Sequence, residues 1–154
     1  MVEPVRLRHR ITRIIAATRF PFVDQETWTD DHITIVNDET RRYAVKWEGG
    51  VTHPSIVITD KNGEIREFGL VEPPETITTE SIPRWKALSD IAPRGRKHKK
   101  LFLYVPEGHE EETLRLLEEN GVDYDGIRGY RVEEQTLRIL PYRTLNDEYD
   151  DVIT

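Results

Sequence analysis

The 154-residue sequence contains no cysteine and no long apolar run. The lack of cysteine excludes disulfide bonds, cysteine-ligated zinc sites and thiol catalysis. No apolar segment approaches the roughly 18 residues that a membrane-spanning helix requires, and the first residues lack the charged-then-apolar pattern of a secretory leader. We therefore expect a cytoplasmic protein that has no membrane partner.

Charge is distributed unevenly along the chain. The formal net charge is −7 at pH 7, yet residues 84–100 contain seven Lys and Arg residues against Asp90 alone. The segments before and after this stretch are acidic, which argues against non-specific coating of nucleic acid or of an anionic membrane. One short basic segment is therefore the natural candidate for contact with phosphate groups.

The length fits one domain with a single core. An amphipathic helix is predicted over 4–18, because Leu7, Ile11, Ile14, Ile15 and Thr18 share one face. Short apolar-rich runs joined by short connections then predict an antiparallel meander of four strands, at 32–36, 41–47, 55–59 and 65–71. The second half predicts a helix ending near 91, a strand at 101–105 buried on both faces, a helix at 109–120 and a hairpin at 127–132 and 136–140. We expect one α/β domain over 1–143, followed by an acidic tail over 144–154.

Arginines flank the apolar face of the N-terminal helix. Arg6, Arg10 and Arg13 lie along one side of it, and Arg8 and Arg19 along the other. They could contact phosphate groups, but long arginine stems also cover the edge of a core while their charged ends stay in water. We favour the covering role.

The hairpin at 53–72 is the segment around which the chain is organised. Asn62-Gly63 favours a two-residue type I′ turn. That turn fixes a register in which Ser55 faces Leu70 and His53 faces Glu72, all on one face of the sheet. His53 and Glu72 could form a polar pair, but two ligands are too few for a protein zinc site.

The local order resembles a nuclease signature. Pro54-Ser55 stands at the start of one strand and Leu70-Val71-Glu72 at the end of the next. The PD-(D/E)xK, restriction-endonuclease-like nucleases carry Pro-Asp and then Asp/Glu-x-Lys at such positions. The similarity extends over roughly 52–142, through a Pro/Thr-rich connection, a helix with Arg84-Trp85-Lys86 and the strand 101–106. It implies a restriction-endonuclease-like mixed sheet with an N-terminal helix, a four-strand antiparallel meander, a crossover helix, a buried strand, a helix and a C-terminal hairpin.

The three signature positions depart from the nuclease pattern. Carboxylates at the first two would hold a divalent metal, and a lysine at the third would stabilise the phosphorane. Ser55, Leu70 and Glu72 occupy them instead, which predicts a catalytically inactive domain with no catalytic residue, metal or other cofactor. The enzymatic alternative is a Mg²⁺-dependent nuclease whose remodelled site combines Glu72 with Asp60 or Glu67.

The basic segment provides the candidate partner surface. Arg94, Arg96, Lys97, Lys99 and Lys100 could neutralise several phosphates of DNA or RNA. The same loop could instead dock an acidic protein, in which case the chain would be an adaptor subunit with no role in nucleic-acid binding. The sequence leaves both partners open for a domain that acts by binding or scaffolding.

Overall fold

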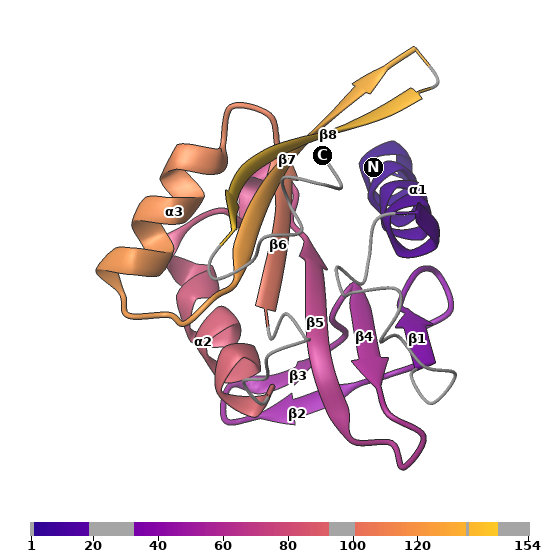
Figure 1. The fold of residues 1–154 in the computed structure, drawn as a ribbon, viewed down its shortest axis with the longest axis vertical. Helices are drawn as coiled ribbons and strands as arrows, with labels where there is room; N and C mark the ends of the chain where they lie inside the picture. Colours follow the sequence, from indigo (N-terminus) through magenta and orange to yellow (C-terminus); the bar gives the residue numbers. More distant parts are fainter. Residues whose placement is uncertain (1, 19–32, 93–100, 135, 145–154) are drawn as a thin grey trace.

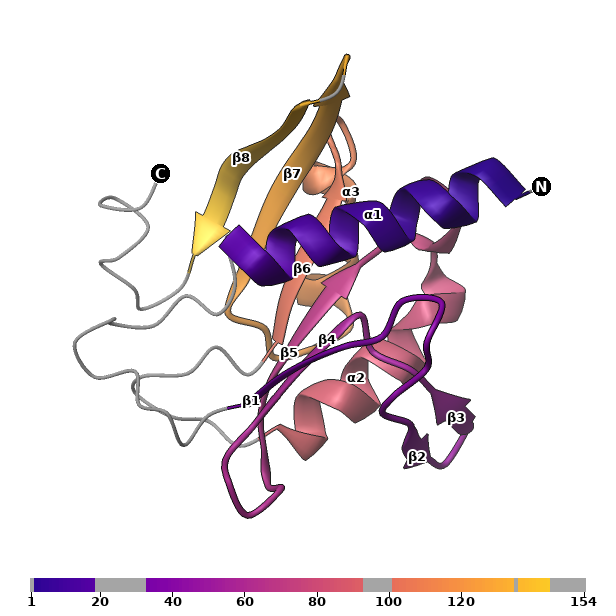
Figure 2. The ribbon, with the colours of Figure 1, turned by 90° about the vertical axis from the view of Figure 1, so that its right-hand side faces the viewer.

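A computed structural model describes residues 2–18, 33–92, 101–134 and 136–144. A six-stranded sheet separates one helix from two helices on its other face (Figures 1 and 2). The predicted α/β class is therefore confirmed. None of the helices in these ranges combines the length and the apolar character needed to cross a membrane.

The elements follow the predicted order with small shifts in their ends, except that the predicted strand 41–47 is shortened to 45–47 and a further strand at 50–52 was not predicted. The helices are α1 (Val2–Thr18), α2 (Ile82–Ile91) and α3 (Glu110–Glu119), with short 3₁₀ helices η1 (Pro74–Thr76) and η2 (Thr79–Ser81) ahead of α2. The strands are β1 (Ile33–Val36), β2 (Val45–Trp47), β3 (Gly50–Thr52), β4 (Ile56–Thr59), β5 (Ile65–Val71), β6 (Leu101–Pro106), β7 (Gly126–Glu133) and β8 (Thr136–Thr144). The acidic tail predicted over 144–154 lies outside the described residues after Thr144.

The main sheet has the strand order β1-β4-β5-β6-β7-β8. Its β5–β6 and β6–β7 pairs are parallel and its other pairs are antiparallel. Parallel neighbours need a crossover connection, which α2 supplies between β5 and β6 and α3 between β6 and β7. The strand β6 is consequently flanked by strands on both sides, and its residues 101–105 are fully buried, as predicted.

The predicted four-strand meander is wrong in its second strand. The strand β2 pairs with β3 in a separate two-stranded sheet, and β1 pairs directly with β4. Asn37 explains this division, because it is 6% exposed and connects three segments. Its Oδ1 accepts the N–H groups of Arg42 and Tyr43 at 2.8 and 2.9 Å, and its Nδ2 donates to the carbonyls of Tyr43 and Pro54 at 2.9 and 2.6 Å. The chain after β1 is thereby held in a loop and does not extend the main sheet.

The predicted two-residue turn at Asn62-Gly63 is also wrong. The Asp60 N–H donates to the Glu64 carbonyl at 2.9 Å, so three residues lie between this pair. The Asp60 carboxylate stabilises the longer turn, since its Oδ1 accepts the N–H groups of Asn62 and Glu64 at 2.9 Å each. Gly63 takes a positive φ of 83°, which glycine adopts without steric cost.

A bulge in β5 cancels the effect of the extra turn residue. Thr59 pairs with Ile65 and Ile58 with Glu67, so Arg66 has no partner across the ladder. Each change moves the alignment by one residue, and the two moves are opposite. Beyond the bulge, the register is the one that the two-residue turn predicts.

The core has two parts, one on each face of the main sheet. On the face covered by α2 and α3, apolar residues including Phe68, Leu70, Trp85 and Leu88 pack together. One side of α2, which corresponds to the predicted helix ending near 91, thus faces the core. On the opposite face α1 packs Ile11 and Ile15 against residues of β4, β5 and β6. The α1 helix therefore covers a second core and is not a detached arm.

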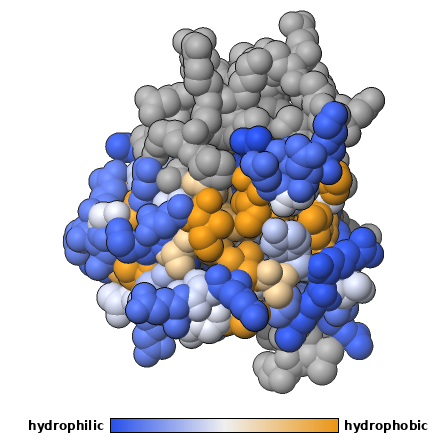
Figure 3. Space-filling view, turned by 90° about the horizontal axis from the view of Figure 1, so that it is seen from below, coloured by the Kyte–Doolittle hydropathy of each residue, from blue (hydrophilic) through white to orange (hydrophobic). Residues whose placement is uncertain are grey.

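One face of the molecule shows apolar side chains gathered between hydrophilic flanks (Figure 3). Large apolar side chains that are more than a third exposed occur on several elements: Leu7, Ile33, Val51, Ile91, Val132 and Tyr142. Because roughly half or more of a folded protein's surface is ordinarily apolar, this face does not by itself identify a partner.

Candidate functional site

The three signature positions come together at one end of the β4–β5 pair. Ile56 faces Gly69, so continuing the register by one residue places Ser55 opposite Leu70. The predicted alignment of these two residues therefore agrees with the structure. The Ser55 Oγ accepts the N–H of Val71 at 2.9 Å, which ties the residue before β4 to the end of β5.

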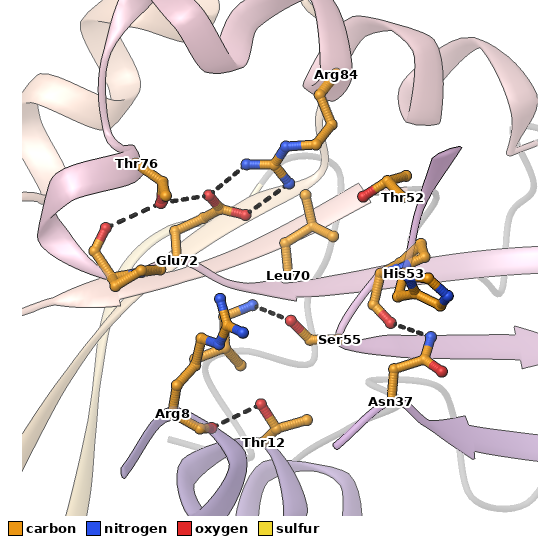
Figure 4. Close-up of a pocket in the computed structure, with 13 residues that line it drawn as sticks. Arg8, Thr12, Asn37, Thr52, His53, Ser55, Leu70, Glu72, Thr76 and Arg84 are labelled. Atoms are coloured by element: carbon orange, nitrogen blue, oxygen red, sulfur yellow. Dashed lines mark hydrogen bonds and ion pairs between the residues drawn. The ribbon is translucent and has the colours of Figure 1, made fainter. Parts of the chain in front are cut away.

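A cavity of about 260 Å³ opens at this end of the sheet (Figure 4). It lies where β5 ends and β4 begins, so residues from α1 and from α2 both reach it. The lining residues are Arg8, Thr12, Asn37, Thr52, His53, Pro54, Ser55, Leu70, Val71, Glu72, Pro73, Thr76 and Arg84. All three signature positions thus share one polar cavity with two arginines.

The Glu72 carboxylate is already satisfied within the protein. Arg84 donates to Glu72 Oε1 at 2.7 Å and to Oε2 at 3.1 Å, and the Thr76 hydroxyl donates to Oε1 at 2.7 Å. The Glu72 side chain is only 4% exposed and that of Arg84 is 23% exposed. A two-point guanidinium–carboxylate contact of this kind is among the stronger polar interactions in proteins. Glu72 therefore serves to fix Arg84, and its charge is neutralised there.

The expected polar pair of His53 and Glu72 is replaced by the contact between Glu72 and Arg84. His53 lies between β3 and β4 and not on a ladder, whereas the Glu72 N–H donates to the Tyr104 carbonyl of β6 at 2.9 Å. Both side chains line the cavity, but they come from segments that do not pair with each other.

The residues of the cavity do not fit a Mg²⁺ site. Such a site needs several hard oxygen ligands, and Leu70 has none to offer while Glu72 is bound to Arg84. Among the described residues no cluster of three or more His, Asp or Glu side chains is arranged to hold a metal ion.

The carboxylates of the enzymatic alternative lie elsewhere. Asp60 sits in the turn at the far end of the hairpin, where its Oδ2 accepts from Arg66 at 2.9 Å. Glu67 is fully buried, and the alternation of side chains along β5 places it on the α1 face of the sheet, whereas Glu72 contacts α2. Neither residue lines the cavity.

Arg8 is a functional candidate to which the sequence analysis gave only the role of covering the edge of the core. It projects from α1 towards the middle of the cavity (Figure 4), while Arg13 on the same helix bonds Asp38 and Glu39 at 3.2 and 2.6 Å. The Thr12 hydroxyl donates to the Arg8 carbonyl at 2.9 Å, which holds the backbone of this turn. In the part of the chain that the structure describes, the Arg8 guanidinium has no acceptor. The helical spacing of the sequence places Arg8 beside the buried face of α1. Only the packing of α1 on the sheet shows that the Arg8 side chain points into the cavity.

Tyr130 of β7 contacts Glu72, one of the residues that line the cavity. Its hydroxyl donates to the Glu72 carbonyl at 3.3 Å. Burial, followed by the charges of Glu72 and Glu75, raises the pKa of Tyr130 to about 12, and Arg8 acts in the opposite direction. Tyr130 therefore stays protonated at neutral pH and acts as a hydrogen-bond donor that helps to position Glu72.

The basic loop predicted to contact nucleic acid lies outside the described residues. Arg94, Arg96, Lys97, Lys99 and Lys100 all fall in the range 93–100 that follows α2. The role of this loop stays a prediction from sequence. Comparison of the chain with models of protein families, with curated proteins and with solved structures found no match, so the geometry of the cavity is the basis for assigning a function.

Proposed function

We propose that the protein is a restriction-endonuclease-like domain that has no metal-dependent nuclease activity and acts as a binding component, with nucleic acid as its partner. The observation that carries this proposal is the state of Glu72. It stands at the lysine position of the nuclease signature and is bound at both oxygens by Arg84. A carboxylate in that state neither holds a metal nor stabilises a pentacoordinate phosphate.

The order of the elements supports the restriction-endonuclease-like part of the proposal. An N-terminal helix, antiparallel strands β1, β4 and β5, the crossover helix α2 and the buried parallel strand β6 follow one another in the expected sequence. The β2–β3 pair is an insertion between β1 and β4 that leaves this order unchanged. The three signature positions lie where β4 begins and β5 ends, and all of them line the cavity.

We expect no cleavage of single- or double-stranded DNA or RNA in Mg²⁺ or Mn²⁺. The reason is the lack of oxygen ligands at positions 55 and 70, together with the neutralised carboxylate at 72. The assay should include Glu72→Ala and, as a matched control outside the cavity, Glu75→Ala. Cleavage that Glu72→Ala abolishes and Glu75→Ala preserves would overturn the proposal in favour of an active, remodelled nuclease.

Binding through the basic loop is tested separately by gel shift. The wild-type protein should retard nucleic acid, and the variant in which Arg96, Lys97, Lys99 and Lys100 are alanine should not. Loss of four phosphate contacts should also flatten the plot of log K against log salt by roughly 0.9 per contact on duplex DNA. A variant with the exposed residues Arg41, Arg42, Arg115 and Arg138 changed to alanine has the same net charge and should bind like the wild type. If wild type gives no shift at any salt concentration, the nucleic-acid partner is contradicted, which is the outcome that the adaptor hypothesis expects.

A further inference from the structure

We infer that the cavity at the end of β5 is a metal-free anion site that takes a phosphate group, with the Arg8 guanidinium as its principal ligand. This inference deepens the proposed function and rests on it, because a metal-binding centre in the same space would need its own set of carboxylates. The new content is the site, its ligand chemistry and the part played by Arg8.

The balance of charge in the cavity is positive. Four residues that can carry charge line it: Arg8, Arg84, Glu72 and His53. The two-point contact of Arg84 with Glu72 cancels one charge of each sign. Arg8 is then left with a charge that no described residue neutralises. A fixed positive charge beside partly buried walls attracts an anion much more strongly than the same charge in open water.

The cavity offers hydrogen-bond donors that no described acceptor occupies. A guanidinium has five N–H donors and no acceptor, and each hydroxyl contributes one proton. The Ser55 Oγ already accepts the Val71 N–H, which leaves its own proton for a ligand. Among the described residues neither Ser55 nor Thr52 has an acceptor for its hydroxyl proton. Phosphate oxygens are strong acceptors and match this set, whereas a metal cation does not.

The arrangement of the donors suits a compact group. Arg8 approaches from α1 and Arg84 from α2, on opposite sides of the cavity (Figure 4). Arg84 is held in place by Glu72, so one side of the site is formed before any ligand arrives. Preformed donors bind an anion with less loss of conformational freedom than mobile surface side chains do.

The size of the cavity limits what it can hold. Its volume of about 260 Å³ is below the roughly 300–1,000 Å³ of sites that enclose a whole small molecule. A phosphate group fits, while the rest of the molecule that carries it would extend into solvent. The carrier can therefore be a small phosphorylated compound or the phosphorylated end of a nucleic acid, and both present the same group.

Titration calorimetry with inorganic phosphate tests the site directly. The wild-type protein should bind phosphate, and Arg8→Gln should weaken binding by about tenfold or more, because it removes a charge-assisted contact. Arg6→Gln is the matched control, since Arg6 is an exposed arginine of the same helix that does not line the cavity. Arg8→Lys should restore part of the affinity. Absence of phosphate binding by the wild type, or equal affinities for Arg8→Gln and Arg6→Gln, would overturn the inference.

Two further arms distinguish the sources of the phosphate. A nucleoside 5′-monophosphate is compared with its unphosphorylated nucleoside, and an eight-nucleotide oligomer with a 5′-phosphate is compared with the same oligomer without it. If the natural ligand is a small phosphorylated compound, the phosphate should raise the affinity of the nucleoside in an Arg8-dependent way, and the oligomer should gain no more affinity than that. If the natural ligand is the end of a nucleic acid, the phosphate should raise the affinity of the oligomer by more than it raises that of the nucleoside. If phosphorylation adds nothing to either ligand, the inference fails.

The outcome of the phosphate-binding experiments can be distinguished from the outcome of the cleavage assay. Phosphate binding without metal-dependent cleavage supports both the proposed function and the anion site. If the protein neither binds phosphate nor cleaves nucleic acid, only the anion site is contradicted. Cleavage that needs Glu72 defeats the proposed function, and with it the metal-free character of the cavity, even if phosphate binds as an inhibitor.

Discussion

Replacing Arg84 by alanine should lower the free energy of unfolding by about 3 kcal/mol, the lower end of the roughly 3–5 kcal/mol measured when one partner of a buried ion pair is removed. Glu72 is 3% exposed, and in the variant its carboxylate would keep only the Thr76 hydroxyl as a side-chain donor. We place the effect at the lower end because the Arg84 side chain is 23% exposed, so water can partly reach the vacated position. Denaturant unfolding at pH 7 measures the change.

Two companion variants make the Arg84 result decisive. Arg115→Ala removes an arginine from an exposed pair with Glu119 on α3 and should cost no more than about 0.5 kcal/mol. Changing both partners, with Arg84→Met and Glu72→Leu, should recover much of the lost stability, because no unpaired charge then stays buried. An Arg84→Ala protein as stable as Arg115→Ala would mean that Glu72 is not held as an ion pair in this cavity.

Replacing Asn37 by alanine should cost about 3 kcal/mol, the second large effect that we expect. Four hydrogen bonds to backbone groups are lost at once, each with a net value of roughly 0.5–1.5 kcal/mol and more where the abandoned group stays buried. The local loss of structure in this variant should be greatest where the chain leaves the main sheet after β1. Faster amide exchange at Arg42 and Tyr43, whose N–H groups lose their acceptor, should accompany the loss of stability.

The chemistry of the Asn37 contacts gives a second test. Asn37→Asp keeps an acceptor for Arg42 and Tyr43 but turns a carboxylate oxygen towards the carbonyls of Tyr43 and Pro54, so it should also be destabilising. Asn62→Ala is the control, because the exposed Asn62 contributes only its backbone N–H to the turn and should change stability by less than about 0.5 kcal/mol. Full stability of Asn37→Asp would show that the donated bonds do not matter.

Local patterns were sufficient for the elements of the second half of the chain. The positions of Ile82, Trp85 and Leu88 on one face of a helix follow from a period of 3.6 residues, and all three are in the core. The end of α3 also follows from the local sequence. The Val122 N–H donates to the Leu117 carbonyl at 2.9 Å, after Gly121 with a positive φ of 66°, which is the Schellman closure that Asn120-Gly121 predicts. Such features are decided within one or two helical turns.

The hairpin shows a correct alignment reached through a different turn. The dipeptide Asn62-Gly63 indicates a two-residue turn, but the carboxylate of Asp60 stabilises a longer one, and the bulge at Arg66 compensates for it. The apolar residues of β4 and β5 explain the outcome. A shift by one residue would turn Phe68 and Leu70 out of the core, so burial outweighs the preference of the turn.

By itself, the sequence determined the α/β class, the order of helices and strands, the faces that they bury and the alignment of Ser55 with Leu70. These depend on periodicity and on contacts between near neighbours. Only the tertiary structure decided that Asn37 separates β2 from the main sheet, that Arg84 neutralises Glu72 twelve residues away, and that Arg8 enters the same cavity from α1. Each of these depends on polar side chains meeting across distant segments, and no local pattern encodes such a meeting, because it is fixed by how the helices pack on the sheet.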